Sequence, residues 1–417
     1  MRKSLIKSLL PISLLCISSQ LLAVDANIKG LIDLRAYHVT SDDGNSYLSG
    51  DYGKFRFDDG FGIALGQLGA NLNLEFNSTW SATVVANAFA NKGNSAIGIT
   101  EGFVSYKGLP SSNGWRIKSK LGVFYPTISF ENVATAWSTP YTLTSSSLNN
   151  WVGEELRNTG INLSLEKLGK FSGSKHNFSG DISLFKNNDP AGAMLAWHGW
   201  TVGSRQTLLH EKLIVQDFPA RQQKLAAQAA ESDPFLELDD RFGLHVSANW
   251  KYANKLRFNL GYYDNFAKEG IVENGQYTWT TEFIHSALKY RFAKEWEVIA
   301  QYMKGNTYMT SPYQEKVVDN DFDNAFVMLR HFWSNHHIAA RFEHFNVDDL
   351  DNIWGDNNNE QGNAFSLAYR YKLSKQSFLL TELNYIDSTR PSRWYVNQAV
   401  DKKESQYQIG YRYYFKH

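Results

Sequence analysis

The sequence predicts an all-β protein, a transmembrane antiparallel β-barrel of about 16 strands with short periplasmic turns and long extracellular loops. Between residues 28 and 415, short segments alternate apolar and polar residues with the period of two of a strand that faces lipid on one side. The connections between these segments are alternately tight and long. In addition, 14% of the residues are aromatic, and no apolar run after residue 26 is long enough for a membrane-spanning helix.

Residues 1–26 have the pattern of a signal peptide. Basic residues precede an apolar stretch over 9–22, which is too short and too polar to span a bilayer as a helix, and small residues follow it. The residues that carry this pattern are Arg2, Lys3, Lys7, Ala23 and Ala26. We therefore expect an exported chain whose residues 27–417 form the barrel. The single cysteine, Cys16, falls in the leader, which excludes disulfides and thiolate metal sites from the rest of the chain.

The connections between strands define two ends of the barrel. Tight turns are expected near residues 77–79, 108–114, 169–175, 253–254, 293–294, 334–335 and 374–375. Long connections are expected over residues 40–60, 91–96, 127–154, 188–240, 267–276, 305–321, 348–361 and 389–404. Because the two kinds alternate, every tight turn falls at one end and every long loop at the other, as in outer-membrane barrels.

Aromatic residues flank the tight turns, where a girdle at the lipid headgroups would need them. They include Phe76, Trp80, Trp115, Phe178, Trp250, Phe292, Trp296, Phe332, Tyr371 and Phe378. In the last segment, Tyr407, Ile409, Tyr411, Tyr413 and Phe415 alternate with polar residues or glycine. The alternative, in which these aromatics fill the core of a soluble β-sandwich, places large apolar residues beside turns that are usually polar.

The layout of strands and loops, together with the aromatic last strand, resembles the bacterial outer-membrane porin superfamily. The stretch 121–160, LGVFYPTISFENVATAWSTPYTLTSSSLNNWVGEELRNTG, is similar to the corresponding part of phosphate-selective-porin-like 16-stranded porins. The resemblance implies a location in the bacterial outer membrane and a homotrimer. It also implies that the third outer loop folds into the lumen and narrows it.

The more polar face of each strand is expected to line the lumen. The inward basic residues and the one histidine among them are then Arg35, Arg116, Lys118, Lys120, Arg241, His245, Arg257, Lys289, Arg330, Arg341, Arg370 and Arg412. Inward acidic residues are fewer, so the wall favours anions. Lys251 also points inward, but it lies beside a turn and can equally extend to the headgroups.

Arg116, Lys118 and Lys120 are three cations at a spacing of two on one strand, which stack along one face about 6 to 7 Å apart. Such a ladder can pass an anion from site to site without holding it tightly. The alternative is that acidic residues on neighbouring strands or loops neutralise the ladder.

Residues 127–154 form the third outer loop, a candidate constriction whose notable residues are Phe130, Glu131, Trp137, Tyr141, Trp151 and Glu154. Folded inward, Glu131 can face the basic wall and set up a transverse field, while the aromatic residues offer a surface for sugars. Alternatively, the loop lies on the surface. The fourth loop, residues 188–240, is the longest. Its segment 219–231 has a helical composition, and the loop is expected to cap the pore or to pack between protomers.

Two loops, residues 40–60 and 348–360, carry clustered carboxylates that can bind divalent cations and bridge lipopolysaccharide, although a solvated loop explains them equally well. Asp189, His198 and Ser204 share one loop and can be written as a catalytic triad, but no nucleophile motif surrounds Ser204. We expect no catalysis, no cofactor and no metal site. The formal net charge of +0 gives no bulk field for nucleic acid, so no nucleic-acid partner is expected.

These observations predict a porin that forms a water-filled channel for passive diffusion of small hydrophilic solutes, with a leaning toward anions. Two alternatives stay open: a substrate-specific channel for sugars or oligosaccharides, and an outer-membrane hydrolase. A channel for hydrophobic solutes is disfavoured, because the inward face is too highly charged.

Overall fold

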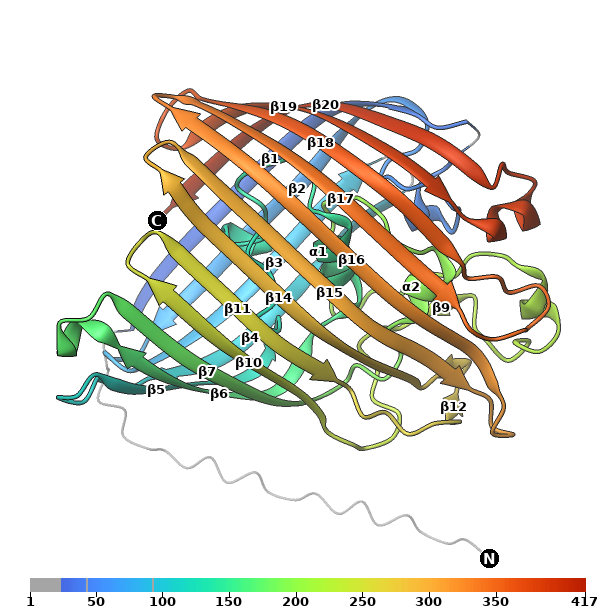
Figure 1. Ribbon diagram of the computed structural model, residues 1–417, viewed down its shortest axis with the longest axis horizontal. Coiled ribbons are helices and arrows are strands. Elements are labelled where there is room, and N and C mark those ends of the chain that lie inside the picture. The colour runs from blue at the N-terminus through green and yellow to red at the C-terminus, as the bar shows by residue number, and fades with distance from the viewer. Residues whose placement is uncertain (1–23, 43, 92–93) are drawn as a thin grey trace, which may run out of the picture.

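The computed structural model describes residues 24–42, 44–91 and 94–417, and in it an antiparallel sheet of 16 strands closes into a barrel (Figure 1). The strands, in order around the barrel, are β1 (Asp25–Thr40), β2 (Gly60–Glu75), β3 (Trp80–Asn91), β4 (Asn94–Lys107), β5 (Trp115–Phe124), β6 (Asn158–Leu168), β7 (His176–Lys186), β10 (Gly243–Tyr252), β11 (Leu256–Asp264), β14 (Trp279–Ala293), β15 (Trp296–Thr310), β16 (Lys316–Trp333), β17 (His336–Asp349), β18 (Glu360–Lys372), β19 (Ser377–Thr389) and β20 (Asp401–Lys416). Pairing of β1 with β20 completes the ring, so the barrel has no free sheet edge. The predicted fold class is confirmed.

The remaining elements are short and lie in the loops. Two small hairpins, β8 (Leu213–Ile214) with β9 (Glu231–Ser232) and β12 (Val272–Glu273) with β13 (Gln276–Tyr277), stand outside the barrel sheet. The α-helices are α1 (Ser147–Glu155) and α2 (Ala193–Trp197), and the 3₁₀ turns are η1 (Tyr47–Ser49), η2 (Thr135–Trp137), η3 (Gly169–Ser172), η4 (Pro219–Gln222) and η5 (Pro391–Val396). No helix of the described residues has both the length and the apolar character needed to cross a membrane.

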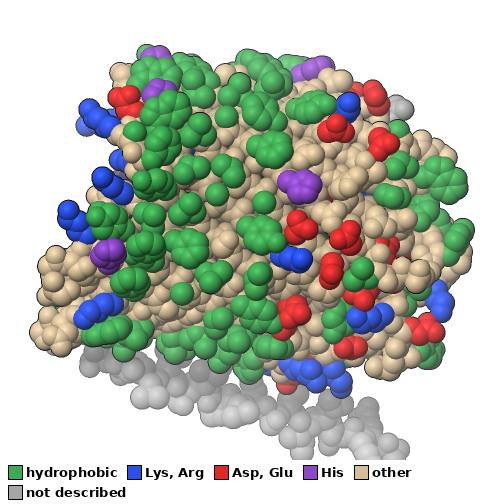
Figure 2. Space-filling model, in the orientation of Figure 1, with side chains coloured by type: hydrophobic (Ala, Val, Ile, Leu, Met, Phe, Trp, Pro, Cys, Tyr) green, Lys and Arg blue, Asp and Glu red, His purple; other side chains and the backbone are tan. Residues whose placement is uncertain are grey.

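The outer surface of the barrel is apolar over the strands. On β5, Ile117 and Leu121 are 57% and 63% exposed, and both point away from the lumen. Figure 2 shows hydrophobic side chains over most of one face, with charged side chains gathered toward its two ends. A closed barrel pairs its backbone N–H and C=O groups between strands, so it can bury such an apolar band in lipid. The aromatic residues next to the turns belong to the outer surface: Trp80, Trp115 and Phe178 are 45%, 47% and 53% exposed.

The seven short connections lie where the sequence predicts them, between β2 and β3, β4 and β5, β6 and β7, β10 and β11, β14 and β15, β16 and β17, and β18 and β19. Two long connections differ from the expectation. The loop expected over 305–321 spans only 311–315, because β15 and β16 continue to pair as far as Thr310 and Lys316. In the second outer connection β3 and β4 reach Asn91 and Asn94, and residues 92–93 lie outside the described residues.

Parts of the two largest loops pack against the inner wall of the barrel. Loop 3 (residues 125–157) and loop 4 (residues 187–242) contribute Trp151, Trp200 and Leu195 to an apolar cluster that also includes Phe283 and Phe322 from the wall. The expectation of a helix over 219–231 is wrong. Only the short turn η4 forms there, with its proline in the first turn, and Glu231 belongs to the extended pair β8–β9. Most of the expected signal peptide, residues 1–26, lies outside the described residues, and β1 begins at Asp25.

Candidate functional site: the lumen and its basic cavity

Loop 3 crosses the lumen and is held by the opposite wall. The loop leaves β5 at Phe124, and α1 begins with Ser146 as its N-cap, whose side chain accepts a hydrogen bond from Asn149 N. Side chains of eight strands bind the loop, with Lys289 on β14 and Asn324 on β16 bound to loop side chains. The other six strands contribute Asn71 on β2, Gln301 on β15, Arg341 and Glu343 on β17, Arg370 on β18, Glu382 on β19 and Arg412 on β20. Because most of these bonds reach loop backbone groups, the inward position of the loop satisfies polar groups that would otherwise be buried without partners.

Glu131 forms the central ion pair of this contact. Its carboxylate lies 2.6 Å from the guanidinium of Arg341, which also lies 2.7 Å from Glu343, and all three side chains are fully buried. Glu131 also accepts hydrogen bonds from Ser146 and Asn149. Glu131 thus faces the basic wall, as expected, but its carboxylate is fully buried against Arg341, so the expectation that it sets up a transverse field across the open pore is wrong.

Several other predicted inward cations also have partners within the lumen. Asp33 binds both Arg35, at 2.8 Å, and Arg412, at 2.6 Å. Arg370 donates to Pro140 O at 2.7 Å, and Arg412 donates to Thr139 O at 2.6 Å. Much of the basic wall therefore holds loop 3 or pairs with inward acids.

A second group of predicted residues surrounds Tyr141 and the histidines. Lys289 donates to Tyr141 Oη at 2.9 Å and lies 3.3 Å from Glu297, while Arg330 pairs with Glu297 and packs 3.9 Å from the centre of the Tyr141 ring. His245 Nε2 lies 3.0 Å from His285 Nε2 in a buried pair. Both cations of the first group pair with Glu297, and Lys289 remains 31% exposed.

The aromatic residues of loop 3 are mostly packed. Phe130, Tyr141 and Trp151 are 1%, 8% and 2% exposed, so the expectation that they present a surface for sugars is wrong. Trp151 packs against Phe283 and Phe322 of the wall. Phe130 and Tyr141 pack in a separate cluster with the wall residues Ile299 and Phe326. Trp137 is partly exposed and stacks on Tyr125 at a ring distance of 4.2 Å.

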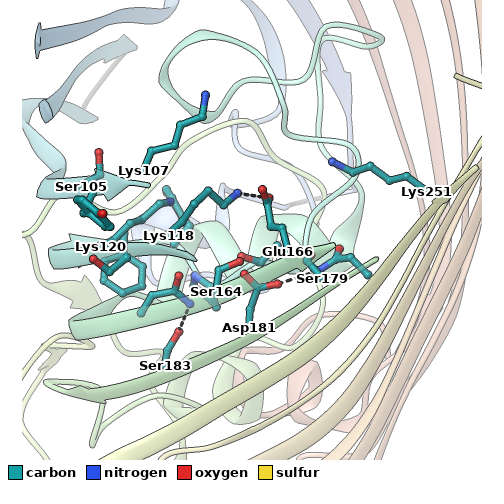
Figure 3. Close-up of a pocket in the computed structure, with 18 of the residues that line it drawn as sticks. Ser105, Lys107, Lys118, Lys120, Ser164, Glu166, Ser179, Asp181, Ser183 and Lys251 are labelled. Atoms are coloured by element: carbon teal, nitrogen blue, oxygen red, sulfur yellow. Dashed lines mark hydrogen bonds and ion pairs between the residues drawn. The ribbon is translucent and has the colours of Figure 1, made fainter. Parts of the chain in front are cut away.

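A cavity of about 290 Å³ lies in the lumen, on the side of the wall formed by β4 to β7, β10 and β11. Its lining includes the cations Lys107, Lys118, Lys120, Lys251 and Arg257, the acids Glu166 and Asp181, and polar residues such as Ser105, Asn162, Ser164, Ser183 and Asn249. In Figure 3, Lys118 points toward Glu166, and Lys251 approaches from the other side of the view. The cavity therefore brings together cations from strands far apart in the sequence.

The ladder on β5 is partly neutralised. Arg116 and Lys118 both lie 2.5 Å from Glu166, so these two cations share one carboxylate. Lys120 instead packs over Phe103, with its nitrogen 4.7 Å from the ring centre. Across the cavity, the guanidinium of Arg257 lies 4.1 Å from the centre of the Phe130 ring. Neutralisation by an acid on a neighbouring strand, the alternative considered for the ladder, therefore applies to Arg116 and Lys118. Lys120 has no such carboxylate contact among the described residues.

The sequence analysis assigned one residue wrongly and missed another. Arg241 is exposed and lies outside β10, which begins at Gly243, so its assignment to the inward face of a strand is wrong. Lys107 lines the cavity and was missed, although it pairs in register with Lys118 across β4 and β5. Residues that pair directly share a face of the sheet. Pairing the two strands across the expected turn near Gly108 would therefore have placed Lys107 on the lumen face beside Lys118.

Loop 4 lies against loop 3 inside the outer half of the barrel. Ser145 N donates to Gly203 O at 2.7 Å, and Asn150 donates to Thr201 at 2.8 Å. Met194 N donates to Glu155 at 3.0 Å. The two loops therefore form one packed unit across the lumen.

Asp189, His198 and Ser204, which the sequence analysis considered as a catalytic triad, bind different partners. His198 Nε2 lies 3.1 Å from Glu154, and the Ser204 hydroxyl accepts hydrogen bonds from Arg35 and Arg56 at 3.0 and 3.1 Å. Asp189 accepts from Leu238 N. Among the described residues, no hydrogen bond joins these three side chains, so they do not form a nucleophile and its base.

One acidic group was not foreseen. One carboxylate oxygen from each of Asp189, Glu237 and Asp239 lies within 4.8 Å of the other two in loop 4. Burial raises the pKa of Asp189 to about 7, and the charges of Asp239 and Glu237 contribute to that rise. The three residues are close in space because the loop returns to its own beginning, which no local sequence pattern indicates.

Comparisons with known proteins agree on the fold. No protein-family model matches the chain, and no curated protein matches it in sequence. An anion-selective porin from Comamonas acidovorans has a TM-score of 0.52 at 12% identity, with 94% of this chain and 100% of that chain covered. The outer membrane channel DcaP of Acinetobacter baumannii has a TM-score of 0.53 at 10% identity, covering 94% and 97%.

A loop-deletion mutant of OmpT, an outer membrane protein of Vibrio cholerae, has a TM-score of 0.50 at 11% identity, covering 94% of this chain and 100% of that chain. At these identities the likeness concerns the fold. The chain therefore shares the fold of these outer-membrane proteins, and in this chain the fold is a closed antiparallel sheet of 16 strands with an apolar outer band.

Proposed function

We propose that the chain forms a water-filled channel for passive diffusion of small hydrophilic solutes, with a preference for anions. The observation that carries this proposal is the basic cavity that remains beside loop 3, lined by Lys107, Lys118, Lys120, Lys251 and Arg257. Solutes that pass loop 3 on this side meet cationic and polar side chains together with apolar surface from Phe124 and Tyr125.

The charge of the cavity lining favours anions. Among the described residues, no ion pair within 4.0 Å involves Lys120, Lys251 or Arg257. On the acidic side, Glu166 binds two cations, and Asp181 accepts a hydrogen bond from Asn249 at 2.9 Å. The excess of cations creates a positive potential in a narrow, partly desolvated space, which raises the local concentration of anions.

The sugar-specific alternative has less support. Carbohydrate binding needs exposed aromatic faces, whereas Phe130, Tyr141 and Trp151 are buried in the contact of loop 3 with the wall. The hydrolase alternative lacks an assembled nucleophile and base, as described above for Ser204 and His198.

The proposal is tested by the conductance of the purified full-length protein in planar bilayers, with the reversal potential measured under a salt gradient. We expect discrete conductance steps and an anion-selective reversal potential. Replacing Lys120, Lys251 and Arg257 by glutamine together should shift the reversal potential toward cations. Arg241→Gln is the matched control, because this arginine is exposed and lies outside the strands. Cation selectivity of the unmodified chain would refute the anion preference, and absence of conductance would refute the channel.

We also propose a homotrimer and contact with lipopolysaccharide as the assembly state and lipid partner. Small residues occupy outward positions of β3, where Ala82, Ala86 and Ala88 lie beside Val84, so a second barrel can approach closely there. At the loop end, the carboxylates of Glu282 and Asp321 are exposed, and Figure 2 shows acidic side chains there that can bind divalent cations shared with lipid phosphates. Sedimentation of the detergent complex distinguishes a trimer from a monomer. Binding of lipopolysaccharide with and without chelator tests the lipid contact.

A further inference from the structure

A second cavity, of about 220 Å³, lies among the outer loops, away from the basic cavity. Its walls come from loop 1 (residues 41–59), loop 3 and loop 4, with Tyr47, Glu154, Met194, Arg205 and Lys212 among the lining residues. Neither the channel nor its anion preference uses this cavity, so we asked which ligand chemistry it would accept.

Glu154, the eighth residue of α1, provides the answer. The residue is 4% exposed and lines this cavity. One carboxylate oxygen, Oε1, lies 3.1 Å from His198 Nε2, but Oε2 is buried and has no hydrogen-bond partner among the described residues. A buried carboxylate oxygen without a donor is costly, so a ligand that supplies an N–H or O–H group there gains the full benefit of the missing bond.

The charges around the cavity favour a cationic donor. Arg205 and Glu211 form an ion pair and neutralise each other, which leaves Glu154 and Glu231 against the single exposed Lys212. The neighbouring Glu155 reports the same field: burial raises its pKa to about 7, and the negative charge of Glu154 contributes to that rise. A hydrogen bond from an ammonium group to a carboxylate is roughly twice as strong as one between neutral groups.

We propose that this outer cavity binds a small solute with a primary ammonium group, which donates to Oε2 of Glu154. Met194 and Leu213, both of which line the cavity, provide apolar contact for the carbon atoms next to the ammonium. The site lies at the outer entrance, so such a solute would meet it before the basic cavity. Binding there does not depend on whether the barrel conducts.

Ligand-observed NMR on the detergent-purified full-length protein tests the proposal, with ethylammonium, glycine, glucose and acetate as probes. Ethylammonium and glycine share the ammonium group, and we expect both to bind at least fivefold more tightly than glucose or acetate. Comparison of the first two shows whether the solute is a simple amine or a zwitterion. Glu154→Gln keeps the shape of the side chain and removes its charge, and it should weaken ethylammonium binding at least fivefold.

Asp217→Asn is the matched control, because Asp217 is an exposed carboxylate of the same loop 4 that does not line the cavity. This variant should bind ethylammonium within twofold of the unmodified protein. Equal binding of ethylammonium to the Glu154→Gln variant would overturn the proposal, as would glucose binding as tight as ethylammonium. Conductance in potassium chloride, measured on the same samples, reports separately on the channel.

Discussion

The guanidinium of Arg341 on β17 lies 2.6 Å from the carboxylate of Glu131 in loop 3, and neither side chain is exposed to solvent. Arg341 also donates to Thr144 O and Ser145 O, at 2.9 and 3.1 Å. The planar guanidinium thus binds a charge and two backbone carbonyls of the loop at once. This contact explains why a loop with few charges folds into a charged lumen.

We expect Arg341→Gln to destabilise the barrel by about 3 to 5 kcal/mol, because it leaves the buried carboxylates of Glu131 and Glu343 without their cation. Urea unfolding in detergent micelles measures the change. Arg241→Gln serves as the control and should stay within about 0.5 kcal/mol of the unmodified chain, since Arg241 is exposed. A loss below about 1 kcal/mol in Arg341→Gln would contradict the assigned role of the pair.

Single substitutions should separate the cations that line the cavity from those that do not. Lys251 lines the basic cavity, whereas Arg116 lies outside its lining and binds Glu166. Potential falls with distance and screening, so Lys251→Gln should shift the reversal potential at least twice as far as Arg116→Gln. Bilayer measurements at low and high salt check this ranking, which an equal shift in the two variants would exclude.

The sequence predicts the barrel well because strand alternation and loop length are local properties. The turn at Ser334 and the alternation of Phe342 with Arg341 are visible without any knowledge of partners. The lumen is different. Glu131 and Arg341 are 210 residues apart, and only the closed ring brings them together, so the sequence pattern could not show that this arginine is paired. The prediction that Arg241 points into the lumen was wrong because β10 begins only at Gly243. A residue before the start of a strand does not follow the alternation of inward and outward side chains.

The acidic group of loop 4 predicts a pH dependence of stability. Burial, with a contribution from Asp239 and Glu237, raises the pKa of Asp189 from 3.8 to about 7. The folded chain then holds this proton more tightly than the unfolded chain. The stability that Asp189 contributes to the folded state is therefore fully present below about pH 4 and is lost as the pH rises to about 7.

Asp189→Asn should therefore flatten the dependence of the unfolding free energy on pH between about 4 and 7, and it should stabilise the protein at pH 8 relative to the unmodified chain. Urea unfolding at several pH values across this range provides the measurement. Asp217→Asn, in the same loop but exposed, should leave the profile unchanged. The opposite sign, with stability rising through this range because of Asp189, would show that the carboxylate is better solvated than its burial implies.

Trp151 of α1 gives the last prediction, because it connects the packing of loop 3 with the width of the channel. Its ring lies 5.8, 5.6 and 5.4 Å from those of Trp200, Phe283 and Phe322, and the side chain is buried. Trp151→Ala should cost about 3 to 5 kcal/mol in the free energy of unfolding. Since the indole also fixes α1 against the wall, the variant should show larger single-channel conductance than the unmodified protein.

The matched control is Trp394→Ala, which removes an equally large side chain that is 72% exposed in η5. We expect this variant to change stability by less than about 0.5 kcal/mol and to leave conductance unchanged. If Trp151→Ala lost stability without any change in conductance, α1 would not border the conducting path. If it changed neither quantity, the packing of loop 3 across the lumen would itself be in error, because a buried indole with three aromatic neighbours cannot be removed from a close-packed interior without cost.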